Sequence, residues 1–293
     1  MGNTRAISTL ATAQLISPNH NTPRTKPVRR LTPHHVAGNL SVSSILGLPN
    51  FQAGGSASAN YAIDSSGKIG LCVEESSRSW ASSSSVNDYQ AITCEIANNG
   101  GAPDWRMSDE AINSWLKLSV DVCKFYGFNK VNYKEKPADV ATSTTASIRS
   151  NAAESWIATW AKDNEMIITL HNWFSATACP GPYFTRQIPW LVKEMNKRLM
   201  DPTWAESFVG EGGLLAITPP ALSAFKEYLI AITAAALNVR KGPGTNYAVE
   251  RVLINDKNLY TIVDEATGEG ASGKWGKLKS GAGWIALNYT KKR

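Results

Sequence analysis

The sequence lacks a long hydrophobic run. No stretch of its 293 residues approaches the roughly 20 consecutive apolar residues that a membrane-spanning helix needs. The first 30 residues are polar and contain no continuous apolar segment of the kind found in a secretory signal peptide. We therefore expect a protein that is made in the cytoplasm without a signal peptide or membrane insertion, and that reaches any external substrate only after release.

Cysteine is also scarce. The chain has four cysteines, Cys72, Cys94, Cys123 and Cys179, which are widely separated and form no Cys-x-x-Cys pair. This spacing excludes a dense disulfide scaffold and is typical of a reducing compartment. We expect most of these residues to be buried thiols.

Positive charge is concentrated in one region. The formal net charge is +6, but residues 228–293 hold ten Lys and Arg against five Asp and Glu, which leaves twenty against nineteen elsewhere. A basic region of this kind binds nucleic acid, an anionic membrane or an anionic polymer such as a Gram-positive cell wall, and charge alone does not choose among them.

The polar composition of residues 1–30 predicts an extended N-terminal arm or a capping segment without firm secondary structure. The pattern of residues 31–200 predicts a mixed α/β domain. Turn residues near Asp64 indicate a hairpin within residues 59–73. Further expected elements are a strand at 92–96, a helix from Ser108 to a stop at Gly127, a helix at 152–162, a strand at 167–170 that ends in His171, and a helix at 186–200 with Pro189 in its first turn.

The composition changes after residue 200. Residues 201–227 mix Gly-Gly and Pro-Pro with small residues and show no periodicity, which predicts a linker. Residues 228–293 contain short β-like runs separated by glycine-rich turns, and their number and length predict a small all-β barrel.

Three parts of the sequence combine into a candidate metal site. His34 and His35 end one expected strand, His171 ends another, and Cys179 follows in a loop. Catalytic zinc takes three protein ligands and keeps one position open, and imidazole nitrogen and thiolate sulfur both suit Zn²⁺. Glu95 alternates with buried-type neighbours on its own strand, so it faces away from Ile92 and Ile96.

The segments TPHHVAG, NYAIDSSGKI, NDYQAITCEI and LHNWFSATACPG, taken in this order, resemble the type-2 amidase family of phage endolysins and autolysins, which also includes peptidoglycan-recognition proteins. The resemblance covers roughly residues 30–200. It implies a mixed β-sheet flanked by helices, with zinc held by His34, His171 and Cys179. His35 stays open as an alternative first ligand. The presence of Cys179 favours catalysis over binding alone.

The resemblance also implies how the amide is cleaved. Zinc would activate a water molecule as the nucleophile, Glu95 matches the family's general base, and Thr177 matches a position that stabilises the oxyanion. A solvent-exposed strand glutamate and a loop hydroxyl that caps the backbone are the structural alternatives. Ala59 occupies the position where another branch of the family has a catalytic tyrosine. The resemblance therefore implies that Glu95 alone carries the proton transfer.

Three residues are candidates for substrate binding: Asn60, Trp80 and Trp173. Aromatic faces bind sugar rings and apolar groups of the stem peptide, so Trp80 and Trp173 would line a groove. Core packing is the alternative for both tryptophans, and it is the stronger one for Trp80.

The C-terminal residues LNVRKGPGTNY, KWGKL and GWI resemble bacterial SH3-type domains, which bind peptidoglycan. The resemblance implies a wall-binding module that raises the local concentration of the enzyme. Leu237, Val239 and Trp284 fit core positions. The candidate ligand residues are Arg240, Lys241, Tyr247 and Trp275.

The sequence therefore predicts a zinc-dependent N-acetylmuramoyl-L-alanine amidase that acts on bacterial peptidoglycan, made in a host cytoplasm as a phage or prophage endolysin. A non-catalytic peptidoglycan-binding protein and a zinc endopeptidase of the stem peptide or crossbridge are the alternatives. Nucleic acid is not the expected partner, and the sequence does not indicate an oligomeric state.

Overall fold

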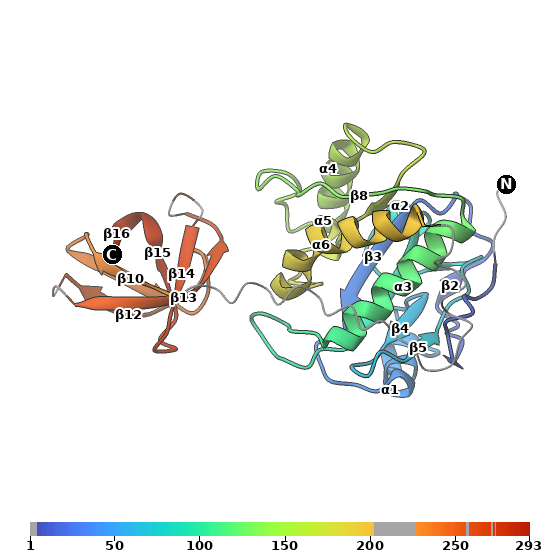
Figure 1. Ribbon diagram of the computed structural model, residues 1–293, viewed down its shortest axis with the longest axis horizontal. Coiled ribbons are helices and arrows are strands. Elements are labelled where there is room, and N and C mark those ends of the chain that lie inside the picture. Colours follow the sequence, from blue (N-terminus) through green and yellow to red (C-terminus); the bar gives the residue numbers. More distant parts are fainter. Residues whose placement is uncertain (1–4, 202–226, 256–257, 271, 273) are drawn as a thin grey trace. The chain divides into compact units, whose positions relative to one another are not determined.

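The computed structural model describes residues 5–201, 227–255, 258–270, 272 and 274–293 and divides into two compact units, Met1–Pro219 and Pro220–Arg293 (Figure 1). Most of the predicted linker, residues 201–227, falls outside the described residues.

The first unit is built on a seven-stranded mixed sheet with the order β1-β5-β4-β7-β3-β9-β8. Strand β3 lies between β7 and β9 and runs parallel to both, while β4 and β5 form an antiparallel hairpin. A separate short pair joins β2 and β6. The strands are β1 Ala13–Gln14, β2 His20–Asn21, β3 Arg30–His35, β4 Tyr61–Ile63, β5 Ile69–Leu71, β6 Arg78–Ser79, β7 Ala91–Ile96, β8 Val131–Asn132 and β9 Met166–Ile168.

Helices flank this sheet, which confirms the predicted α/β class. The long helices α3 and α6 pack against each other and lie in front of β3 and β4 in Figure 1. Trp115 of α3 meets Phe184 of α6 edge to face, with ring centroids 4.9 Å apart. The helices are α1 Val42–Leu46, α2 Ser85–Asp88, α3 Asp109–Phe125, α4 Ala146–Ala158, α5 His171–Phe174 and α6 Pro182–Leu199, with a 3₁₀ turn at Pro49–Phe51.

Helix α3 shows how closely local signals can define an element. Its N-cap is Ser108, whose Oγ accepts a hydrogen bond from the backbone N–H of Ala111. Two acidic residues in the first turn and a lysine in the last turn complement the helix dipole. Gly127 follows with a φ of 78°, a left-handed conformation that glycine adopts without strain. The predicted hairpin at 59–73 is likewise present, as β4 and β5.

The last helix differs from its prediction. It begins at Pro182 rather than at residue 186, so Pro189 lies inside the helix and not in its first turn. Proline suits the first helical position, because the N–H that it lacks has no partner there in any case. The prediction placed Pro189 in the first turn because proline is tolerated there. Packing of the apolar face outweighs its missing hydrogen bond, since Ile188, Leu191 and Met195 are completely buried. Helix α4 also begins six residues before its predicted start.

The N-terminal arm is part of the first unit. Strand β1 extends the sheet by pairing in parallel with β5. Arg5 forms ion pairs with the buried Glu75 and with Asp121. Arg24 is buried, and its guanidinium donates hydrogen bonds to three backbone carbonyl oxygens. The described part of this segment therefore contains strands β1 and β2, which the prediction of a segment without firm secondary structure did not include, and specific polar contacts hold it.

The second unit is all β, with antiparallel strands in the order β12-β11-β15-β14-β13-β10-β16. Its core contains Val239, Ile262, Trp275, Trp284 and Ile285, each at most 4% exposed. This confirms the small β unit expected from the short apolar runs. The strands are β10 Tyr228–Ile232, β11 Ala236–Arg240, β12 Val249–Ile254, β13 Leu259–Thr267, β14 Lys274–Leu278, β15 Trp284–Ala286 and β16 Thr290–Lys292.

All four cysteines are free and buried, as the sequence predicted. Among the described residues, no helix combines the length and the apolar character required to cross a membrane.

Candidate active site

The candidate site lies where three parallel strands of the first unit end. His34 of β3 pairs in register with Glu95 of β7, and residues paired across parallel strands present their side chains on the same face. His171 comes three residues after the end of β9, on the other side of β3, as the first residue of α5. The expected strand therefore stops before His171, but it still brings this residue to the same edge of the sheet.

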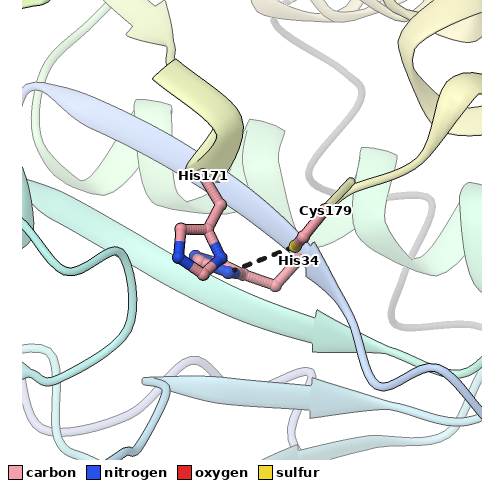
Figure 2. A group of neighbouring side chains, drawn as sticks. All are labelled: His34, His171 and Cys179. Carbon is pink, nitrogen blue, oxygen red and sulfur yellow. Dashed lines mark hydrogen bonds between the residues drawn. The ribbon is translucent and has the colours of Figure 1, made fainter. Parts of the chain in front are cut away.

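His34, His171 and Cys179 converge at this edge (Figure 2). Their ligand atoms lie within 4.8 Å of one another. The thiol sulfur of Cys179 is 3.5 Å from Nδ1 of His34, and the two imidazole rings are 4.8 Å apart. His35 is not part of this group: its ring stacks on Trp105 at 4.7 Å, and its Nδ1 accepts a hydrogen bond from the N–H of Ala37.

The electrostatics of the cluster fit a metal ion. The Nε2 atoms of His34 and His171 are buried without a hydrogen-bond partner in the described chain, which is costly unless another ligand satisfies them. Burial lowers the pKa of His34 well below its usual value and that of His171 to about 4, so both rings are neutral. Burial also raises the pKa of Cys179, so a thiolate here requires a cation. Two neutral nitrogens and one sulfur suit zinc.

Glu95 is the acidic group beside this cluster. Its Oε2 atom is buried and has no hydrogen-bond partner in the described chain. Desolvation raises the pKa of the carboxyl group to about 7. A carboxylate with a pKa near neutrality exchanges protons readily at physiological pH, as a general base or acid must.

Thr177 lies in the loop between His171 and Cys179. Its side chain is exposed, and its Oγ1 accepts a hydrogen bond from the backbone N–H of Cys179 at 3.2 Å. The hydroxyl thus supports the loop that carries Cys179, as in the structural alternative, and it also remains accessible to solvent. Its role toward an oxyanion stays a prediction.

The predicted substrate-binding residues occupy different environments. Asn60 is fully buried, and its amide group bonds to the backbone of Val73 and Thr93. Trp173 is 2% exposed and packs edge to face on Trp156. Trp80 is half-buried, and its Nε1 donates to the side chain of Asn21. The burial of Asn60 and Trp173 favours structural roles, so their contact with substrate stays a prediction that the structure does not support.

Trp105 is a residue near the site that the sequence did not single out. It is half-buried, has a φ of 54° and stacks on His35. Gly181, two residues after Cys179, allows this contact, because a Cβ atom there would lie 2.7 Å from Cβ of Trp105. The only sequence signal was the lack of a side chain at Gly181, which does not identify its distant partner.

The candidate wall-binding residues of the second unit also differ in exposure. Arg240 donates to two backbone carbonyl oxygens within its own turn, and Lys241 forms an ion pair with a glutamate on β12. Tyr247 is 43% exposed. Trp275 is 2% exposed and belongs to the core, so its predicted contact with a wall polymer is not supported by its position.

Residues 24–182 match the N-acetylmuramoyl-L-alanine amidase family, and the chain belongs to this family. The match covers more than half of the chain and includes His34, His171 and Cys179. A search of curated proteins found no match.

The chain is also similar to several solved structures. The Staphylococcus aureus hydrolase AmiA, solved in complex with its ligand, is 13% identical, with a TM-score of 0.43 over 63% of this chain and 81% of that one. The amidase LysC from Clostridium intestinale URNW is 13% identical, with a TM-score of 0.39 over 61% and 97%. The Drosophila peptidoglycan-recognition protein SD is 15% identical, with a TM-score of 0.35 over 64% and 88%.

Proposed function

We propose that this N-acetylmuramoyl-L-alanine amidase is a zinc enzyme in which His34, His171 and Cys179 hold the metal. The observation that carries the proposal is the convergence of two neutral histidines and one buried cysteine, in which neither Nε2 atom has a hydrogen-bond partner in the described part of the chain. Zinc bound there would supply Lewis-acid catalysis, since it polarises a carbonyl group and makes water acidic enough to attack at neutral pH.

Glu95 is the proposed general base. Its register opposite His34 supports this role, as does the raised pKa of its carboxyl group. In its ionised form, Glu95 accepts a proton from the water molecule that attacks the amide carbon. It then donates that proton to the leaving amino group of L-alanine. The exposed hydroxyl of Thr177 is the proposed hydrogen-bond donor to the oxygen of the tetrahedral intermediate.

The second unit is the proposed SH3-type wall-binding module, and the whole chain is the proposed endolysin of a phage or prophage. The positive charge of residues 228–293 supports binding to an anionic wall polymer. The all-β architecture and the exposed side chains of Tyr247 and Lys241 support it as well. The proposed host is Gram-positive.

The first experiment measures bound metal and the products of peptidoglycan digestion for the native protein and for His171→Ala, Cys179→Ala and Glu95→Gln. We expect about one zinc per native chain, and new L-alanine amino termini on otherwise intact stem peptides. The two ligand variants should lose both metal and cleavage. Glu95→Gln should keep the metal and lose about 10²- to 10⁴-fold in rate.

Two results would contradict the proposal. New amino termini within the crossbridge would indicate an endopeptidase instead. A native protein that binds peptidoglycan without metal and without cleavage would indicate a recognition protein.

A further inference from the structure

The two neighbours of β3 hold it in different ways. The backbone pairing between β3 and β7 continues to the end of both strands, through His34↔Glu95 to His35↔Ile96. The pairing between β3 and β9 covers only two positions, and its last backbone hydrogen bond runs from Thr169 N to Leu31 O. Backbone hydrogen bonds therefore fix Glu95 relative to His34, whereas the described chain has none joining residues 32–35 to residues 170–171.

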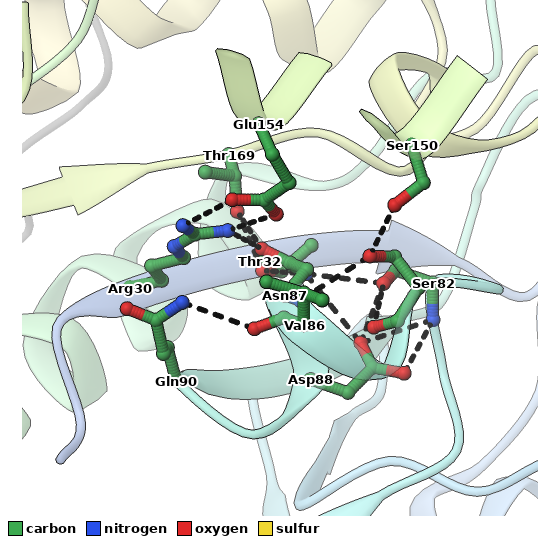
Figure 3. Close-up of polar contacts among 11 residues, drawn as sticks. Arg30, Thr32, Ser82, Val86, Asn87, Asp88, Gln90, Ser150, Glu154 and Thr169 are labelled. Atoms are coloured by element: carbon green, nitrogen blue, oxygen red, sulfur yellow. Dashed lines mark hydrogen bonds and ion pairs between the residues drawn. The ribbon is translucent and has the colours of Figure 1, made fainter. Parts of the chain in front are cut away.

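Side chains continue the connection where the backbone ladder stops (Figure 3). Thr32 Oγ1 and Thr169 Oγ1 are 2.8 Å apart. The hydroxyl of Thr169 donates to Oδ1 of Asn87 at 2.9 Å, and Nδ2 of Asn87 donates to Oγ1 of Thr32 at 3.2 Å. With the Thr32 hydroxyl as donor to Thr169, these contacts form a closed ring of three hydrogen bonds, called here the Thr-Thr-Asn ring. All three side chains are completely buried.

The ring lies directly before the two histidines. Thr32 precedes His34 by two positions on β3, so both side chains are on the same face. Thr169 precedes His171 by the same two positions. The hydrogen bond between the two threonines therefore joins the two segments that carry His34 and His171, two residues before each histidine.

Further contacts fix Asn87 in place. Arg30 donates to its Oδ1 at 3.2 Å and forms a two-bond ion pair with Glu154 of α4 (Figure 3). Nδ2 of Asn87 also donates to Oγ of Ser82, and its backbone N–H donates to Oγ of Ser84. The ring is thus anchored to β3, α2 and α4 rather than held by the threonines alone.

An apolar residue could occupy the positions of Thr32 and Thr169 without needing any hydrogen bond. Valine has nearly the shape of threonine and suits a buried strand without needing partners. Each buried hydroxyl and amide costs free energy unless its hydrogen bonds are made, so such groups restrict the structure to the one arrangement that satisfies all of them. The ring therefore accepts only one spacing of the two strands.

We propose that the Thr-Thr-Asn ring is a positioning device that sets the distance between His34 and His171 and so preforms the metal site. The inference rests on the proposed zinc function of the cluster. Thr32, Asn87 and Thr169 act through the histidines and do not touch the metal or the substrate.

The test compares Thr169→Val, which breaks the ring, with Thr169→Ser, which keeps the hydroxyl. Zinc affinity is measured for each full-length chain by competition with a chromophoric chelator, and the geometry of the site by the absorption spectrum of the cobalt-substituted protein. We expect Thr169→Val to bind zinc about 10- to 100-fold more weakly, as is usual when groups supporting metal ligands are removed, and to change the cobalt spectrum. Thr169→Ser should restore both properties.

Thr93→Val is the matched control. Thr93 is a completely buried threonine on β7 in register with Thr32, and its Oγ1 contacts Ser79 and Asn60 instead of the ring. It should lose thermal stability and keep native zinc affinity. If Thr169→Val does not fold, Thr32→Val breaks the same ring from the other strand.

Three outcomes would overturn the inference. Native zinc affinity and a native cobalt spectrum in Thr169→Val would leave the ring without a positioning role. Equal weakening in Thr169→Val and Thr93→Val would reduce its effect to general stability. A native protein that binds neither zinc nor cobalt would overturn the proposed function together with the inference, and this result distinguishes that failure from the other two.

Discussion

The two units use buried side chains for different purposes. In the first unit, His34 and His171 are brought to strand ends with nitrogen atoms that have no hydrogen-bond partner among the described residues. In the second unit, Trp275 and Trp284 fill an apolar core. In the sequence, both the histidines and the tryptophans lie in segments that resemble known protein families. Nε1 of Trp275 also lacks a hydrogen-bond partner among the described residues, but it lies alone in an apolar core. The comparison teaches that several buried polar atoms converging on one another, as in His34, His171 and Cys179, indicate chemistry, whereas an isolated one does not.

Removal of the metal should produce the largest difference between the two units, because it should affect cleavage by the first unit and leave wall binding by the second unit unchanged. Treatment with a chelator should abolish cleavage of peptidoglycan, because the three residues of the cluster then lack the proposed zinc. Residues 228–293 contain no histidine or cysteine, so retention of the chain on intact cell walls should not change. Activity is measured by turbidity loss and retention by co-sedimentation.

Re-addition of zinc to the chelated protein is the control and should restore cleavage. Full activity after complete removal of metal would contradict the comparison, as would loss of wall retention in parallel with loss of cleavage.

The next effect concerns the core of the second unit. Trp275→Ala should destabilise this unit by about 3–5 kcal/mol, the usual cost of deleting a large buried aromatic side chain. Wall retention should fall because the module unfolds, while cleavage of soluble muropeptides continues. Calorimetry on the full chain would show the transition of the second unit shifted to lower temperature.

Tyr247→Ala is the matched variant, because Tyr247 is an exposed aromatic residue of the same unit. We expect it to keep the native unfolding transition and to weaken wall retention. If both variants unfold at the native temperature and both lose retention, Trp275 acts as a wall ligand and the core assignment is wrong.

The smallest effect concerns a carboxylate whose hydrogen bonds are all made. Burial alone would raise the pKa of Asp64, but hydrogen bonds from Ser66, Val42 and Lys68 lower it below its ordinary value. The ionised group therefore stabilises the fold above its unfolded-state pKa, and this contribution is lost as the pH falls through the folded-state pKa. Asp64→Asn should cost about 1–3 kcal/mol at neutral pH and much less in acid.

Glu95→Gln tests the opposite case, a buried carboxylate without a full set of hydrogen bonds. One oxygen of Glu95 is buried without a partner in the described chain, so removing its charge should not lower the free energy of unfolding of the metal-free protein. Denaturant unfolding of both variants at several pH values checks the two expectations. A constant loss for Asp64→Asn from neutral to acidic pH would contradict the assignment of its stability to the carboxylate.

Elements with strong local signals were predicted well. The cap at Ser108 and the apolar spacing of α3 act within a few residues, and so do the turn residues around Asp64. The start of α6 was misjudged because a proline inside a helix costs free energy locally, and only the buried face of the whole helix offsets this cost. The burial of Asn60 was not predicted, and core packing of Trp173 was only one of two alternatives, since burial depends on distant parts of the chain.

The candidate ligands His34, His171 and Cys179 could be identified from residue types and from the resemblance to a family. Their convergence could not, because it depends on which strands become neighbours. The choice between His34 and His35 shows this clearly: alternation along β3 places them on opposite faces, but only the packed sheet decides which face meets Cys179.

By itself, the sequence determined the two kinds of unit, the main helices and hairpin, and the residue types able to bind zinc, because periodicity, capping and side-chain chemistry act over short distances. The tertiary structure alone decided which polar atoms have no partner among residues 5–201 and the other described segments, that Trp105 stacks on His35, and that Asn87 closes a ring with Thr32 and Thr169. These features join residues up to 137 positions apart, and such contacts form only when the strands pack side by side.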